Sequence, residues 1–264
     1  MDSVRGRLLA FLIVLTGVFG TAYALGEKLP GHNHGGHTHS HTAVLVPPGF
    51  EAGDYVLVTD SVTGGNGTPR TLTFHLEMKD GMRVTNFEIA HEALLHTILI
   101  RPDLSGFQHI HPDITADGSW KVTLDEPGQW HLVFDSTPKG ETLPVVVSAN
   151  ADDEVSVEPQ ALPAPNDNVV QDGLRIVRSG LDFTVFNEDG TPATLEPYLG
   201  QAAHLVAIRQ GDLAYVHLHA VPDPTMPEMF MFGGALPQPG TYRMFLQFGH
   251  DGAVVTVPFT VTQP

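Results

Sequence analysis

The chain has 264 residues, and its 13 Lys and Arg against 30 Asp and Glu give a formal net charge of −17. A chain this acidic, with no basic stripe, is a poor ligand for nucleic acid or for an anionic membrane surface. It contains no cysteine, which excludes disulfides, thiolate zinc fingers, iron–sulfur clusters, type 1 copper sites and cysteine nucleophiles. Histidine is in excess, with 15 residues, and their positions carry most of the functional information.

The N-terminus has the pattern of an export segment. Arg5 and Arg7 precede an uncharged apolar run from Leu8 to Leu25, which is typical of a secretory signal or an N-terminal membrane anchor. Ala22-Tyr23-Ala24 has the small residues of a signal-peptidase site. We therefore predict a signal peptide or anchor over residues 1–25. Either one places the rest of the chain outside the cytoplasm, and without cleavage the protein stays tethered to the membrane.

Residues 26–48 are polar, rich in Gly and Pro, and predicted to form a flexible tether. Five imidazoles within ten residues of flexible chain bind divalent transition metals with low selectivity. A cloning tag is the alternative, although tags are usually contiguous and terminal. The tether histidines are His32, His34, His37, His39 and His41.

Two bodies of about 100 residues follow, at 49–150 and 169–264, joined by a linker over 151–168 that is rich in Pro and acidic residues. Both contain short β-branched and aromatic runs, such as 71–78 and 254–261, separated by Gly, Pro, Asn and Asp. This pattern predicts an all-β chain with two tandem immunoglobulin- or cupredoxin-like β-sandwich domains.

The two bodies also repeat each other. In the first, His96 precedes the pair His109 and His111 by thirteen residues, and in the second His204 precedes His217 and His219 by the same interval. The offset between the two sets is 108 residues throughout. Further along, Pro127-Gly128-Gln129-Trp130 corresponds to Pro239-Gly240-Thr241-Tyr242.

Each His-x-His pair points to one face of its strand, because residues i and i+2 share a face. Two neutral imidazoles placed in this way can share a metal ion, and His96 or His204 on a neighbouring strand can supply a third ligand. One alternative is that the pairs are solvated or form hydrogen bonds at a domain interface. Another is that His96 is a structural histidine at the core edge. If two similar faces pack together, the ligands lie between the domains.

The second body carries further candidate ligands. Thioethers select Cu(I), and an additional imidazole follows them in the chain. Core filling is the alternative for the methionines. These candidates are Met226, Met229, Met231 and His250. His75, His91 and His131 belong to no group, and Glu92 beside His91 is a weaker candidate.

The stretch His91-Glu-Ala-Leu-Leu-His96 through Phe107-Gln-His-Ile-His-Pro112 resembles a motif of exported bacterial heavy-metal-binding proteins. It is also similar to the small extracytoplasmic sandwich domains of the YtkA/FixH type. The Pro-Gly-x-aromatic strand starts resemble those of cupredoxin-like and immunoglobulin-like sandwiches. The resemblance covers residues 50–150 and 169–264, and implies an extracytoplasmic protein that handles copper or another metal.

We therefore expect a non-enzymatic protein that binds, stores or delivers a transition metal outside the cytoplasm. Copper, as Cu⁺ or Cu²⁺, is favoured and zinc is the alternative, with a membrane metal transporter as the candidate partner. A second hypothesis is an envelope interaction module without metal. A third is a cupin-like metalloenzyme, because Gly211 with His217 and His219 resembles the start of a cupin motif and His131 its later histidine. Those two parts, however, fall in different bodies.

Overall fold

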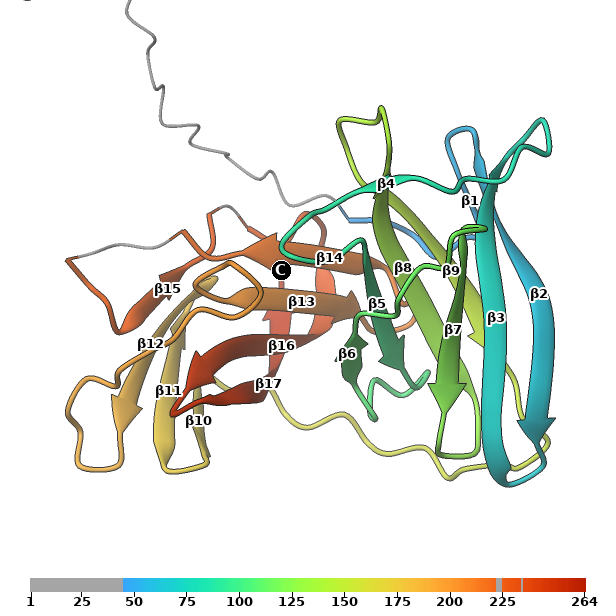
Figure 1. Cartoon of the computed structure of the whole chain (residues 1–264). Coiled ribbons are helices and arrows are strands. Elements are labelled where there is room, and N and C mark those ends of the chain that lie inside the picture. The colour runs from blue at the N-terminus through green and yellow to red at the C-terminus, as the bar shows by residue number, and fades with distance from the viewer. Residues whose placement is uncertain (1–44, 222–224, 234) are drawn as a thin grey trace, which may run out of the picture. The chain divides into compact units, whose positions relative to one another are not determined.

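The computed structural model describes residues 45–221, 225–233 and 235–264, and these residues belong to one compact unit (Figure 1). The predicted signal or anchor segment and the five tether histidines lie outside the described residues. Within the described part every regular element is a β-strand, and no helix there has the length and apolarity to cross a membrane.

The first domain consists of two antiparallel sheets. One has the strand order β1-β2-β3-β7, and the other contains β4, β5, β6, β8 and β9, with β8 between β5 and β9. Aromatic rings fill the space between the sheets, with Phe74, Trp120 and Phe134 in mutual contact. The strands are β1 (Glu51–Ala52), β2 (Tyr55–Gly65), β3 (Thr68–Met78), β4 (Phe87–Glu88), β5 (Leu95–Ile100), β6 (Gln108–Ile110), β7 (Ser119–Leu124), β8 (Trp130–Pro138) and β9 (Val145–Ala151).

The second domain repeats this plan, with sheets ordered β10-β11-β12-β15 and β14-β13-β16-β17. The order β14-β13-β16-β17 matches β6-β5-β8-β9 of the first domain, so the duplication in the sequence is also a duplication of strand pairing. The prediction of an all-β chain with two tandem β-sandwich domains is confirmed. The strands are β10 (Asn168–Gln171), β11 (Leu174–Ser179), β12 (Asp182–Asn187), β13 (His204–Arg209), β14 (Tyr215–His219), β15 (Met229–Met231), β16 (Gly240–His250) and β17 (Ala253–Gln263).

Strands β5 and β13 are buried on both faces. Leu95 and Leu99 of β5 point into the core of their own sandwich, whereas Ile98 and Ile100 belong to a separate apolar cluster with residues of the second domain. A strand covered on both sides needs a continuous apolar run rather than an alternating one. The uninterrupted run Thr97-Ile-Leu-Ile100 therefore reflects the packing of one sandwich against the other.

The interdomain cluster joins equivalent faces of the two domains. Phe107 and Phe245 stack with their ring centroids 3.9 Å apart, and Tyr215 donates a hydrogen bond of 3.2 Å to Asp135 across the interface. Burying a side chain of this size contributes about 1.5–3 kcal/mol, so the apolar contacts hold the two domains together. The buried members are Ile98, Ile100, Leu104, Val133, Val206, Ile208, Tyr215 and Phe245.

The tether prediction needs one correction at its C-terminal end. Val46 pairs with Tyr215 through two backbone hydrogen bonds, of 2.8 and 2.9 Å. The sequence predicts a flexible segment up to Pro48 because residues 26–48 are polar and rich in Gly and Pro. Val46 is nevertheless ordered, because it satisfies the free edge of β14.

Candidate metal centre

The six histidines of the duplicated pattern lie on the faces where the two sandwiches meet. In β14, Val216 and Leu218 point into the core of the second domain, which turns His217 and His219 to the opposite side. On β13, His204 lies directly opposite His219 in the ladder. The first domain repeats this arrangement, with His109 on β6, His111 just after it, and His96 on β5.

Each set of three brings its ring nitrogens together. In the first triad (His96, His109 and His111), Nδ1 of His96 lies 3.2 Å from Nε2 of His109 and 3.1 Å from Nε2 of His111. In the second triad (His204, His217 and His219), Nδ1 of His204 lies 3.2 Å from Nε2 of His217. Within each triad, one nitrogen per ring lies within 4.8 Å of the others, which is a spacing that a single metal ion can span.

A backbone carbonyl sets the tautomer of the central histidine in each triad. Nε2 of His96 lies 3.0 Å from the carbonyl oxygen of Ala90, and Nε2 of His204 lies 3.0 Å from that of Tyr198. A carbonyl oxygen only accepts hydrogen bonds, so Nε2 carries the proton in both rings. Nδ1 of each ring is left with its lone pair directed at the other members of the triad.

The second histidine of each triad is oriented by the opposite domain. Nδ1 of His109 donates to Oε1 of Gln247 at 2.7 Å, and Nδ1 of His217 faces Oδ2 of Asp135 at 3.5 Å. Asp135 and Gln247 occupy equivalent places, since Asp135 lies opposite His96 in its ladder and Gln247 lies opposite His204. The two contacts are therefore reciprocal across the interface. Each leaves Nε2 of the contacted ring as an acceptor.

The hydrogen bond of His109 to Gln247 and the ion-pair contact of His217 with Asp135 leave two lone-pair nitrogens facing each other at 3.2 Å in both triads. Such a contact is repulsive, and a cation between the two nitrogens would relieve the repulsion. Metal-binding histidines characteristically use the other ring nitrogen to donate to a carbonyl or carboxylate, which fixes their tautomer and orientation. The two triads have this arrangement.

Burial keeps the triad rings neutral. Burial, together with a smaller contribution from neighbouring imidazoles, lowers the pKa of His109 and of His204 to about 3 and that of His111 to about 4. Burial also places the pKa of His217 well below its usual value and raises that of Asp135 to about 6, although Tyr215 donates to this carboxyl group. Neutral imidazole is the form that binds metal.

His91 is a member of this region that the sequence pattern did not group with the triads. Its ring centroid lies 3.6 Å from that of His219, 6.2 Å from His96 and 6.1 Å from His204. It sits in a left-handed turn with φ of 50°, and the equivalent residue of the second domain, Leu199, has φ of 49°. The offset of 108 residues relates His91 to Leu199. Because Leu199 is not a histidine, the repeat of histidines in the sequence did not include His91.

The methionines and His250 do not join the triads. Strand β15 belongs to the other sheet of the second domain, and its Phe230 points into the core, so Met229 and Met231 face outward on the opposite side of the sandwich. Met226 is 37% exposed in the turn before β15. His250, at the end of β16, donates from Nδ1 to the carbonyl of Thr194 at 2.8 Å. The structure therefore places these four candidates apart from the triads, because a shared domain does not imply a shared face.

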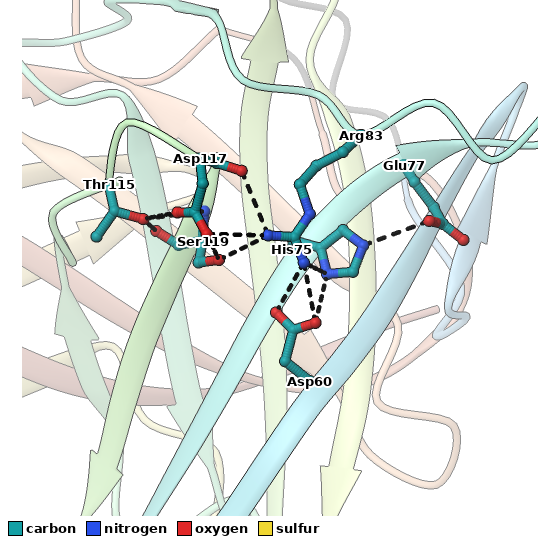
Figure 2. Close-up of polar contacts among 7 residues, drawn as sticks. All are labelled: Asp60, His75, Glu77, Arg83, Thr115, Asp117 and Ser119. Carbon is teal, nitrogen blue, oxygen red and sulfur yellow. Dashed lines mark hydrogen bonds and ion pairs between the residues drawn. The ribbon is translucent and has the colours of Figure 1, made fainter.

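His131 and His75 have other structural partners. Nδ1 of His131 lies 2.8 Å from Oδ1 of Asn150, within the sheet of its own domain. His75 lies on β3 within a charge network, where its Nδ1 is 3.0 Å from Asp60 and 2.7 Å from Arg83, and its Nε2 is 3.3 Å from Glu77 (Figure 2). The Arg83 guanidinium supplies the positive charge of this cluster, whereas the triads contain only neutral rings. Its contacts tie the segment after β3 to the outer face of the sheet.

A family model matches residues 51–153 and 174–264. The chain belongs to that family, which is described as Domain of unknown function (DUF8832). The first matched segment contains every strand of the first sandwich, and the second contains every strand of the second sandwich except β10. A search of the curated proteins found no match.

Two solved structures share a general likeness with the chain. The first is of FdeC, described as a broadly conserved Escherichia coli adhesin, with 16% identity, a TM-score of 0.23, and coverage of 83% of this chain and 65% of the adhesin chain. The second is of the FN1–FN3 domains of chicken CNTN1, with 13% identity, a TM-score of 0.20, and coverage of 83% and 69%. The chain thus spans about two thirds of the adhesin structure. TM-scores this low carry no functional argument.

Proposed function

We propose that this protein binds two transition-metal ions through its histidine triads, and that it stores or delivers them outside the cytoplasm. The observation that carries the proposal is the pair of lone-pair nitrogens at 3.2 Å, repeated in both domains with the same carbonyl partner. His75, by contrast, has a charged partner at each of its ring nitrogens.

The donor set favours copper, with zinc as the alternative. Imidazole nitrogen suits copper and zinc, and Cu²⁺ exceeds Zn²⁺ in affinity for a given nitrogen site. The net charge of −17 would attract cations to the protein. The apolar N-terminal run supports an extracytoplasmic location, and the tether histidines would capture ions with low selectivity before transfer to the triads. A membrane metal transporter is the proposed partner.

The proposal is tested by metal stoichiometry in the full chain with the five tether histidines replaced by serine. We expect two equivalents of Cu²⁺ per chain after removal of loosely bound metal. The double variants H109A/H111A and H217A/H219A should each retain one equivalent. The variant H250A, which removes a histidine remote from both triads, should retain two.

Circular dichroism of each variant would establish that the β-sandwiches remain folded. A folded tether-free protein that retains no stoichiometric copper or zinc would overturn the proposal. The proposal is also overturned if the triad variants and H250A bind equal amounts of metal.

A further inference from the structure

The two triads lie almost as close to each other as their members lie within each triad. Ring centroids within the triads are 4.5–5.5 Å apart. Between the triads, His217 lies 5.5 Å from His96 and 5.5 Å from His109, while His204 lies 5.9 Å from His109. The six rings therefore form one continuous cluster, and ions held in the two triads would be close neighbours.

The orienting contacts connect the two halves of this cluster. His109 of the first triad is held by Gln247 of the second domain, and His217 of the second triad is held by Asp135 of the first domain. Neither triad has its full set of contacts unless the two domains are docked. Formation of one site is thus structurally coupled to formation of the other.

Rings of both triads also line one small cavity. It has a volume of about 180 Å³ and is bordered by His96 of the first triad and by His217 and His219 of the second. Its polar wall also includes His91, Asp135, Ser136 and Thr137. A small ligand in this cavity has access to both triads at once.

The charge of the loaded cluster specifies the class of that ligand. Three imidazoles supply three neutral donors to each ion, which leaves a coordination position open in a four-coordinate site. Two divalent ions bring four positive charges to six neutral ligands. Buried charge is costly unless it is paired, so a small anion in the cavity would be strongly favoured.

We propose that the two triads act as one two-metal centre between the domains, in which a small anion of the hydroxide or azide class enters the cavity and binds both ions. This inference rests on the proposed function, because it requires that each triad holds a metal ion. It adds that the two ions are coupled and that they share an exogenous ligand.

The test uses the tether-free full chain loaded with two equivalents of Cu²⁺. In the electron paramagnetic resonance spectrum, we expect magnetic coupling between the ions to remove or broaden most of the signal. The single-triad variants, with one Cu²⁺ each, should give the full signal of an isolated ion. Titration with azide should produce a charge-transfer absorption that saturates at one azide per two coppers and changes the coupling.

The outcomes separate the two proposals. A protein that binds two Cu²⁺ ions and gives two full, isolated signals overturns the coupled centre but leaves the metal-binding function intact. Saturation at two azides per protein, with no change in coupling, overturns the shared ligand. A protein that binds no stoichiometric copper overturns both.

Discussion

The two triads are alike in the positions of their ligands and different in what surrounds them. Both place a central histidine against a backbone carbonyl and a second histidine 3.2 Å away. The second histidine contacts the neutral Gln247 in the first triad, but the carboxyl group of Asp135 in the second. His91 stacks on the second triad, and its counterpart in the repeat is Leu199. Duplication therefore preserves the ligand geometry, while single substitutions beside it set the local charge.

Metal removal should have the largest effect on stability, because both triads would lose their metal ion at once. Each ion at 100 times its dissociation constant stabilises the folded state by about 2.7 kcal/mol, which for a chain of this size corresponds to a rise of roughly 5–10 °C in Tm. Differential scanning calorimetry with and without a chelator measures this shift. Each single-triad variant should show about half of the total shift for two ions, and an unequal split would show which triad binds more tightly.

Acid should destabilise the metal-free protein. The pKa values of His109 and His204, at about 3 in the folded state, lie below the value of 6.5 for an exposed histidine. The unfolded chain therefore binds more protons between these limits, so stability is full above pH 6.5 and falls as the pH decreases toward 3. Each such group contributes a slope of up to about 1.4 kcal/mol per pH unit. Urea unfolding at several pH values measures the slope, and a flat profile would contradict burial of the rings.

An exchange of the orienting residues tests the difference in charge. D135N should lower the affinity of the second triad for its ion by about 10–100-fold, which is the usual effect of losing a hydrogen-bond partner of a metal-binding histidine. Q247E should strengthen divalent-ion binding at the first triad, because it gives His109 the carboxyl partner that His217 already has. Competition with a chromophoric chelator measures both affinities. If D135N lowered the affinity for both ions equally, Asp135 would not act on the second triad alone.

The smallest effect should come from the turn that carries His91. H91L copies the residue that the second domain carries at the same backbone angle, so the turn should keep its fold. We expect H91L to change the visible spectrum of the ion in the second triad with little change in stoichiometry. The reciprocal variant L199H should change the spectrum of the ion in the first triad. Identical spectra in all three proteins would mean that His91 does not influence the centre.

Much of this architecture was accessible from the sequence. The spacing of His96 to His109 and of His204 to His217 predicted an adjacent pair of strands, because a strand, a turn and a return strand need about that many residues. The alternation Val216-His217-Leu218-His219 predicted a pair of rings on one face, since the pleat of a strand is a local property. The sequence did not show that the methionines lie on another sheet than the second triad, because which sheet a strand joins is decided by long-range pairing.

The sequence by itself therefore determined the all-β class, the duplication and the members of each triad. Only the tertiary structure decided that the two triads share one interface, that Asp135 and Gln247 each serve the opposite domain, and that His91 reaches His219. The physical reason is that side-chain alternation is set within a few residues of a strand. The partner of a ring nitrogen, by contrast, depends on how two faces, separated by about 100 residues of chain, pack together.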